Sequence, residues 1–234
     1  MKYAVLLILL GSALLLLGVR MGGGFAAWLL AWTGASFGAV GAAYAGLGPR
    51  VLGKRPDGAL AWPNVVLLLP YFGLTWGLWY AQRFLGQEPS RTEIAPGLWL
   101  GRRPVGAHEL PPAVVLVADL TSEFAAARRI VCGNAAYHSL PTLDAAAPPN
   151  PRAFDDLVRA LAGASAPVYV HCALGHGRSA LVVAAVLVAR GLANDAARAE
   201  ALIKAARPGV GLNKAQRAFL SKWCAANSTK EFFA

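Results

Sequence analysis

A cysteine and an arginine close together in the chain, Cys172 and Arg178, have the residue types and the spacing for chemistry on an oxyanion. Five residues separate them, and these include Gly175 and Gly177. The Val-Tyr-Val run at 168–170 before the cysteine and the apolar stretch after the arginine predict a strand, a loop and then a helix. Such a loop gathers backbone N–H groups and a helix N-terminus around one point, which makes an anion site.

The two side chains contribute different interactions to this site. N–H dipoles and a fixed guanidinium stabilise the ionised form of a thiol, so we expect Cys172 to be a nucleophilic thiolate. The planar guanidinium of Arg178 can bond two phosphate oxygens at once, and it can close a ring around a tetrahedral anion. The expected substrate-binding residues are those of the loop itself: Ala173, Leu174, Gly175, His176, Gly177 and Arg178.

The motif His171-Cys172-x-x-Gly175-x-x-Arg178-Ser179 resembles the signature of the protein tyrosine and dual-specificity phosphatases, the Cys-x5-Arg phosphatases. The resemblance covers roughly residues 93–225 and is closest to the compact dual-specificity branch, here as a membrane-anchored, bacterial-type member. Weaker supporting matches lie at 98–101, 118–121, 140–144, Arg207-Pro208, and Leu212-Asn213 with Gln216.

The resemblance implies a role for each of four residues. Cys172 would be the nucleophile that forms a phosphocysteine intermediate, and Arg178 would bind the phosphoryl oxygens and stabilise the transition state. Ser179 would donate a hydrogen bond to the thiolate. Asp144 would protonate the leaving oxygen and then activate water. Asp119 competes for the acid role, but in the family that position is usually structural. The resemblance implies no metal and no organic cofactor.

The remaining histidines and cysteines leave alternatives open. We expect His171 to orient the loop by hydrogen bonding. His176 is either an exposed residue of the loop or a positive charge that helps to bind a polyanionic head group. Lipid-directed relatives often have basic residues in this loop. The alanine at 173 weakens the second interpretation. Cys132 and Cys224 are expected to be inert, and the cysteine spacing does not suit a structural zinc site.

Charged residues are distributed unevenly along the chain. The 234 residues carry a net charge of +10, and only 15% are charged, against about 25% in an ordinary soluble domain. The deficit lies in the N-terminal third, so we expect a transmembrane region at 1–85 and a catalytic domain at 90–228. The sequence has no run of Lys and Arg interleaved with aromatic residues, so it does not indicate nucleic-acid binding.

Three apolar stretches, near 3–19, 25–47 and 59–81, approach the length of about 20 residues that a spanning helix needs. We therefore expect about three transmembrane helices, with Gly34 permitting close packing in the second. A cleaved signal peptide is the alternative for the first stretch, but no small-x-small cleavage site follows it. The flanking charges do not fix the orientation. Because a catalytic thiolate must stay reduced, we expect the catalytic domain in the cytoplasm and a multi-pass location in the inner or plasma membrane.

Short apolar runs alternate with helical segments after residue 90, which predicts an α/β domain with a central mixed sheet flanked by helices. Asn150 and Pro151 predict a helix start, and Gly191 predicts a helix end. We expect strands at 98–100, 114–118, 135–140 and 168–170, and helices at 122–130, from Pro151, at 179–189, between Asp195 and Pro208, and after Asn213.

Three functions are compatible with these features. The first is a dual-specificity protein phosphatase that acts on phosphotyrosine or phosphoserine/threonine near the membrane. The second is a lipid phosphatase for a phosphatidylglycerophosphate or phosphoinositide head group. The third is a membrane scaffold that binds phosphate groups without hydrolysis, and the presence of Cys172, Arg178 and Asp144 argues against it. The expected partners are therefore a phosphorylated protein or phospholipid substrate and membrane lipid.

Overall fold

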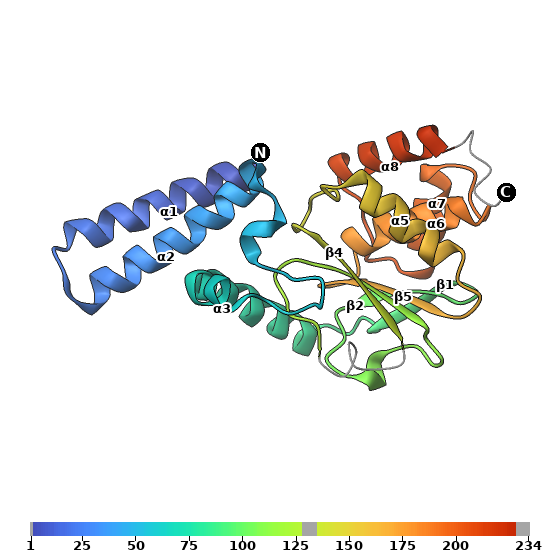
Figure 1. The fold of residues 1–234 in the computed structure, drawn as a ribbon, viewed down its shortest axis with the longest axis horizontal. Helices are drawn as coiled ribbons and strands as arrows, with labels where there is room; N and C mark the ends of the chain where they lie inside the picture. The colour runs from blue at the N-terminus through green and yellow to red at the C-terminus, as the bar shows by residue number, and fades with distance from the viewer. Residues whose placement is uncertain (1, 128–134, 228–234) are drawn as a thin grey trace. The chain divides into compact units, whose positions relative to one another are not determined.

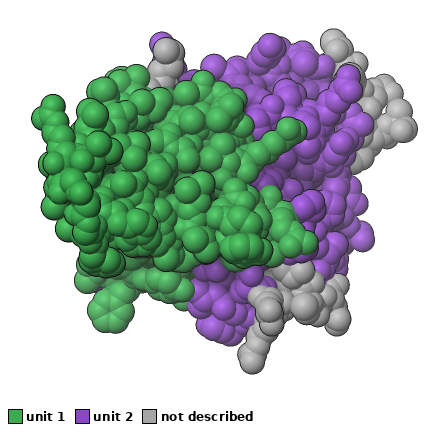
Figure 2. Space-filling view, turned by 60° about the vertical axis from the view of Figure 1, so that its left-hand side comes forward, with its two compact units in different colours: residues 1–55, 59–86, 122–125 green, residues 56–58, 87–121, 126–234 purple. Residues whose placement is uncertain are grey.

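The computed structural model describes residues 2–127 and 135–227, which fall into two units (Figure 2). Unit 1 comprises residues 1–55, 59–86 and 122–125, and unit 2 comprises residues 56–58, 87–121 and 126–234. Unit 1 contains the apolar N-terminal helices. Unit 2 contains a β-sheet and the 172–178 loop, which runs from Cys172 to Arg178.

Unit 1 begins with a hairpin of two helices, α1 (Lys2–Arg20) and α2 (Gly24–Ala42), which lie side by side (Figure 1). The backbones touch where glycines face each other: a Cβ added to Gly11 would lie 2.7 Å from the carbonyl oxygen of Gly34. Small residues at such a crossing are typical of membrane helix pairs. The hairpin is followed by a π-helical turn (Ala43–Leu47), a 3-10 turn (Pro49–Leu52) and α3 (Trp62–Leu85).

Pro70 lies inside α3, and side chains of α2 compensate for the disturbance that it causes. Proline has no N–H, so it cannot bond the carbonyl of Val66 one turn earlier. The indole Nε1 of Trp32 donates to that carbonyl at 3.1 Å instead. The N–H of Tyr71 donates to the hydroxyl of Ser36 at 3.3 Å. Two side chains of α2 thus bond backbone groups of α3 next to its proline.

Among the described residues, two helices are long and apolar enough to cross a membrane. They are Lys2–Arg20, with mean hydropathy 2.2, and Gly24–Leu47, with mean hydropathy 1.3. Helix α3 lies where the third span was expected, but it does not meet the same criterion. Three spans therefore remain a prediction, and two candidate helices are the finding.

Unit 2 contains one five-stranded mixed sheet with strand order β1-β2-β5-β3-β4. Strands β1 and β2 are antiparallel, and the other neighbours are parallel. The central strand β5 is buried along its whole length, because it is paired on both edges and packed on both faces. The strands are β1 (Arg91–Ala95), β2 (Leu98–Arg102), β3 (Leu116–Thr121), β4 (Ala136–Thr142) and β5 (Val168–Cys172).

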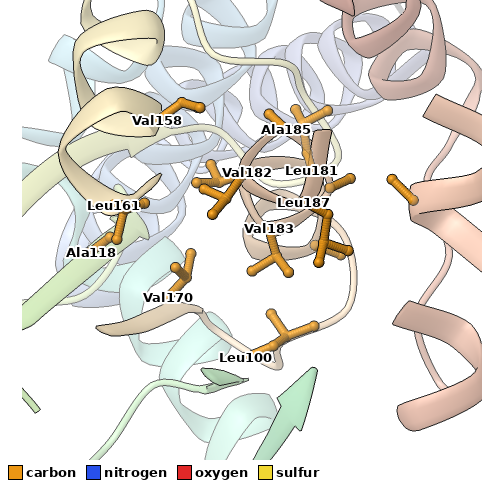
Figure 3. Packing of buried hydrophobic residues seen from close by; sticks show 14 of the residues in the cluster. Leu100, Ala118, Val158, Leu161, Val170, Leu181, Val182, Val183, Ala185 and Leu187 are labelled. Carbon is orange, nitrogen blue, oxygen red and sulfur yellow. The ribbon is translucent and has the colours of Figure 1, made fainter. Parts of the chain in front are cut away.

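In the described part of unit 2, four α-helices lie on one side of this sheet: α5 (Pro151–Ala162), α6 (Arg178–Ala189), α7 (Ala196–Ala206) and α8 (Lys214–Asn227) (Figure 1). Helix α6 is buried almost throughout. Figure 3 shows Val183 of α6 in the same core as Leu100 of β2 and Val170 of β5. Burying each such side chain stabilises the fold by about 1.5–3 kcal/mol. The strand before the 172–178 loop and the helix after it are therefore fixed by the core.

The α/β class and most of the expected elements are confirmed. The side chain of Asn150 caps α5 by accepting hydrogen bonds from two N–H groups, and that of Asp195 caps α7 by accepting one from the N–H of Arg198. Gly191 has a φ of 70° just beyond α6, where the helix end was expected. Strand β1 was not anticipated, because its sequence Arg-Thr-Glu-Ile-Ala has the polar character of an edge strand.

The helix expected at 122–130 is wrong as far as the structure describes it, because residues 122–127 are not helical. Residues 128–130 lie outside the described residues. Within unit 1, carbonyls of this segment accept hydrogen bonds from side chains rather than from a following helical turn. The carbonyl of Glu123 accepts from the indole of Trp76 at 2.8 Å, and that of Phe124 accepts from the ammonium group of Lys54.

Glu200 of α7 ties the start of α8 to the rest of unit 2. Its carboxylate accepts two hydrogen bonds from Arg217 of α8, each at 2.9 Å, and one from the N–H of Leu212 at 3.4 Å. The bonds from Arg217 lower the pKa of Glu200 to about 2. They stabilise the charged form, so protonation of Glu200 weakens this attachment of α8.

This pKa predicts how Glu200 contributes to stability as the pH changes. The folded state holds the proton more weakly than the unfolded state, whose carboxyl has a pKa of 4.5. The stabilisation is therefore complete above that value and is lost as the pH falls toward about 2. We expect Glu200→Gln to lower the free energy of unfolding at neutral pH, and the difference from the original protein to shrink on acidification. Denaturant titrations across this pH range measure it; a pH-independent difference would contradict the assignment.

Candidate active site

The 172–178 loop begins with a buried thiol that accepts hydrogen bonds. Cys172, the last residue of β5, is 3% exposed. Its Sγ accepts a hydrogen bond from the N–H of Gly175 at 3.3 Å and another from the hydroxyl of Ser179 at 3.2 Å. Donors aimed at sulfur stabilise a thiolate relative to a thiol. The structure therefore brings Cys172 and Ser179 together as the sequence predicted, with the sulfur turned toward the loop.

Gly175 allows this loop to lie directly on β2. Its φ is +81°, in the region that favours glycine, and a Cβ added to it would lie 2.6 Å from the carbonyl carbon and oxygen of Gly101. A side chain at position 175 would therefore push the loop away from the strand. The N–H that donates to Cys172 belongs to this same glycine, so the close approach and the bond to sulfur depend on each other.

Arg178 is buried beside the carboxylate that was expected to be the acid. Its guanidinium NH1 donates to the carbonyl of Thr142 at 2.9 Å, and its NH2 lies 3.2 Å from Oδ1 of Asp144. The side chain of Arg178 is 1% exposed and that of Asp144 is 75% exposed. A phosphate group bound to this guanidinium would thus lie next to a carboxyl group that solvent and substrate can reach.

The amide side chains of Asn213 and Gln216 hold the segment that follows Asp144. Asn213 Nδ2 donates to the carbonyl of Ala145 at 2.7 Å, and Gln216 Nε2 donates to that of Ala146 at 3.2 Å. Ala145 has a φ of 56°, which is unusual for a residue other than glycine and needs such support. The sequence pointed to Asn213 and Gln216 only as a family resemblance and gave no role for them.

Asp119, the other candidate acid, is buried in a hydrogen-bond network. Its Oδ1 accepts from the N–H and the hydroxyl of Thr121 at 2.8 and 2.7 Å, and its Oδ2 accepts from the Tyr137 hydroxyl at 2.7 Å. Burial, followed by the charge of Asp119, raises the pKa of Tyr137 well above its usual value. His171 Nδ1 lies 3.8 Å from the Asp119 carboxylate and 3.4 Å from the Cys172 carbonyl. This arrangement suits an orienting network rather than an acid at the mouth of the loop.

The other loop residues present their carbonyls to neighbouring segments. Ala173 accepts from the N–H of Arg103 at 3.1 Å, and Gly177 accepts from the N–H of Leu181 at 2.9 Å. Leu174 accepts from a buried arginine, and the side chain of His176 pairs with a carboxylate. These bonds hold the carbonyls of Ala173, Leu174 and Gly177 in place.

The cysteines outside the loop have no part in this geometry that the structure describes. Cys224 of α8 is buried in the helix-side core, and burial raises the pKa of its thiol. Cys132 lies outside the described residues. In residues 2–127 and 135–227, no group of three or more His, Cys, Asp or Glu side chains is placed to hold a metal ion.

Comparison with known families identifies the domain. Residues 113–228 match the family model of the Swiss Army Knife protein phosphatase domain of the DSP-PTPase type, PTP-SAK. The domain belongs to the dual-specificity phosphatase family. Like its family, this phosphatase is a cysteine-dependent hydrolase of phosphate monoesters. The match extends from just before β3 to the end of α8, and so includes the whole of the loop.

Solved structures of dual-specificity phosphatases share the fold. Human DUSP28 is 26% identical with a TM-score of 0.52, and the match covers 60% of this chain and 97% of that one. A mouse putative dual specificity phosphatase complexed with zinc tungstate is 24% identical with a TM-score of 0.54, and covers 63% and 94%. PTPMT1 in complex with PI(5)P is 21% identical with a TM-score of 0.50, and covers 59% and 97%. No curated protein matches the chain by sequence.

The contacts of Asn213 generate a test of the segment after Asp144. Asn213→Ala removes the hydrogen bond to Ala145, so the carboxyl group should be held less firmly. If Asp144 protonates the leaving oxygen, we expect kcat/KM, which reports on the step that releases the leaving group, to fall about tenfold for an alkyl phosphate, whose leaving group needs a proton, and less for p-nitrophenyl phosphate. Asn227→Ala, at the other end of α8, is the matched control and should change neither rate. Equal losses on both substrates would show that Asn213 does not act through the acid.

Proposed function

We propose that Cys172, Arg178, Asp144 and Ser179 carry out the hydrolysis in two steps. In the first, the Cys172 thiolate attacks phosphorus, an S–P bond forms, and the ester P–O bond breaks as Asp144 gives its proton to the leaving oxygen. In the second, the Asp144 carboxylate takes a proton from water, the water oxygen bonds to phosphorus, and the S–P bond breaks. The hydrogen bond from Ser179 stabilises the thiolate that leaves.

One observation supports this proposal above all others: the sulfur of Cys172 accepts hydrogen bonds at the start of a loop that ends at a buried guanidinium. The N–H of Gly175 and the hydroxyl of Ser179 are the donors. Arg178, with the N–H groups of residues 173–178, would bind the three peripheral phosphoryl oxygens and stabilise the charge that develops on them. These groups come from the chain alone, so the proposed mechanism needs no metal and no organic cofactor.

The substrate that we propose is a phosphorylated protein, at tyrosine or at serine and threonine. The family assignment favours this class. The pairing of His176 with a carboxylate also reduces the positive charge that the loop offers to a polyanionic head group. The alternative is a phospholipid head group, which the apolar N-terminal helices favour because they would keep the enzyme near lipid. Relative rates on phosphopeptides and on vesicles containing phosphatidylglycerophosphate or a phosphoinositide separate the two.

We also propose that unit 1 is embedded in a membrane by α1, α2 and α3, with the catalytic domain in the cytoplasm. Large apolar side chains are exposed along these helices, such as Leu16 at 62%, Phe25 at 76% and Phe84 at 89%. Water disfavours so much exposed apolar surface, and lipid does not. Only residues 86–90 separate α3 from β1, so the phosphatase domain follows the apolar region without a long linker.

The chemistry is tested with the full chain in detergent and p-nitrophenyl phosphate as substrate. We expect hydrolysis in the presence of a chelator and a thiol reductant, and inhibition by vanadate, which mimics the transition state. Cys172→Ser should abolish turnover, because a hydroxyl at this site is a far weaker nucleophile. Asp144→Asn should lower kcat about 100-fold. Activity that survives Cys172→Ser would overturn the mechanism.

The membrane arrangement is tested with tags at both termini. Three spans place the N-terminus and the catalytic domain on opposite sides, whereas two spans place them on the same side. We expect the chain to stay in the membrane after alkaline carbonate extraction. In right-side-out vesicles, external protease should remove the N-terminal tag and leave the C-terminal tag. Protection or loss of both tags together would show that α3 does not cross the membrane.

A further inference from the structure

Three side chains with ionisable groups contact one another at the 172–178 loop: Glu88, His176 and Arg207. Glu88 precedes β1, and its Oε2 lies 2.6 Å from Nε2 of His176 and 3.1 Å from NH2 of Arg207. One carboxylate oxygen therefore contacts a side chain of the loop itself and a guanidinium from the segment after α7. None of these three side chains takes part in the proposed chemistry, so their convergence on the loop needs a separate explanation.

Arg207 is almost fully buried, at 2% exposed. Burial lowers the pKa of its guanidinium, and the charge of Glu88 opposes that shift. A buried cation whose counter-charge is removed is strongly destabilised, so Glu88 is what allows Arg207 to occupy this position. From there, NH1 of Arg207 donates to the carbonyl of Pro89 at 2.9 Å, and NH2 donates to that of Leu174 in the loop at 3.2 Å.

The bond to Leu174 leads directly to the nucleophile. A peptide unit is planar, with its C=O and the next N–H pointing in opposite directions. When Arg207 holds the carbonyl of Leu174, it also fixes the direction of the N–H of Gly175. That N–H is the one that donates to Cys172 Sγ at 3.3 Å. A chain of contacts thus runs from Glu88 through Arg207 and one peptide unit to the sulfur.

His176 provides a second attachment of the same kind. Its side chain pairs with Glu88, and its carbonyl accepts from the N–H of Gly211 at 3.2 Å. Holding that carbonyl fixes the N–H of Gly177, which is one of the N–H groups proposed to bind phosphate. The packing is close on this side: a Cβ added to Gly209 would lie 2.8 Å from Glu88 Oε1 and 3.0 Å from His176 Nε2.

We propose that Glu88 is a positioning residue of the phosphatase reaction. Through Arg207 and His176 it sets two peptide units of the 172–178 loop, so that their N–H groups point at the thiolate and at the phosphate. The proposal rests on the proposed function of this loop. It also assigns His176 to loop geometry rather than to head-group recognition, since its Nε2 is engaged by the carboxylate.

Glu88→Gln in the full chain in detergent tests the proposal, with Glu93→Gln as the matched control. Glu93 lies on β1, and its carboxylate accepts from the N–H of Gly97, a bond that glutamine can still accept. We expect Glu88→Gln to lower kcat/KM for p-nitrophenyl phosphate about tenfold, because small displacements of reacting groups have large effects on rate. Vanadate inhibition should weaken by a similar factor, and Glu93→Gln should stay within twofold of the original protein in both measurements.

The inhibition constant separates positioning from a loss of folded enzyme. A smaller folded fraction lowers kcat but leaves the vanadate constant of the surviving molecules unchanged, whereas a displaced loop changes both. Glu88→Asp, which retains the charge on a shorter side chain, should recover part of the loss. If the inhibition constant of Glu88→Gln for vanadate is within twofold of that of the original protein, the proposal is overturned. If Cys172→Ser is inactive at the same time, the proposed function of the loop is unaffected.

His176→Gln tests the same pair from its other member. The side chain of His176 is 35% exposed, so its replacement carries less risk to folding than that of a buried residue. Should Glu88→Gln fail to fold, His176→Gln decides the matter. We expect a larger inhibition constant for vanadate and a lower kcat/KM for this variant. Values within twofold of the original protein would overturn the proposal.

Discussion

The hydrogen bonds that Cys172 Sγ accepts from Gly175 and Ser179 are the interaction on which the rest of the structure depends. A thiol becomes a nucleophile only as its anion, and a buried anion exists only where donors converge on it. Convergence requires the loop to bend back over its own first residue. That bend is possible because β5 and α6, on either side of the loop, are fixed in the core of the domain.

The 172–178 loop is held by contacts with other segments as well as by β5 and α6 at its two ends. Three of its carbonyls accept hydrogen bonds from outside the loop, from the N–H of Arg103, the guanidinium of Arg207 and the N–H of Gly211. The residues on that outer side come from segments far apart in the sequence, before β1 and after α7. The proposed anion site therefore depends on long-range contacts, and Glu88 contacts both Arg207 and the side chain of His176.

The sequence was sufficient for the loop and insufficient for what surrounds it. Strand-loop-helix patterning and the spacing of Cys172 and Arg178 are local properties, so the elements on either side of the loop and the α/β class could be predicted. The contacts of Glu88, Asn213 and Gln216 depend on which segments meet in space, and periodicity carries no such information. The same limit explains why residues 122–127 are not helical as expected. This segment has helical composition, but side chains of unit 1 donate hydrogen bonds to its carbonyls.

The proposed reaction passes through a phosphocysteine intermediate at Cys172. Rapid acid quenching of the full chain during turnover of p-nitrophenyl phosphate, followed by peptide mass spectrometry, examines that claim directly. Asp144→Asn should help, because water is then activated more slowly and the intermediate accumulates. We expect a phosphoryl group on the peptide that contains Cys172. Mild treatment that cleaves the S–P bond should release it. A phosphoryl group on another residue, or turnover with no covalent intermediate at any time point, would contradict it.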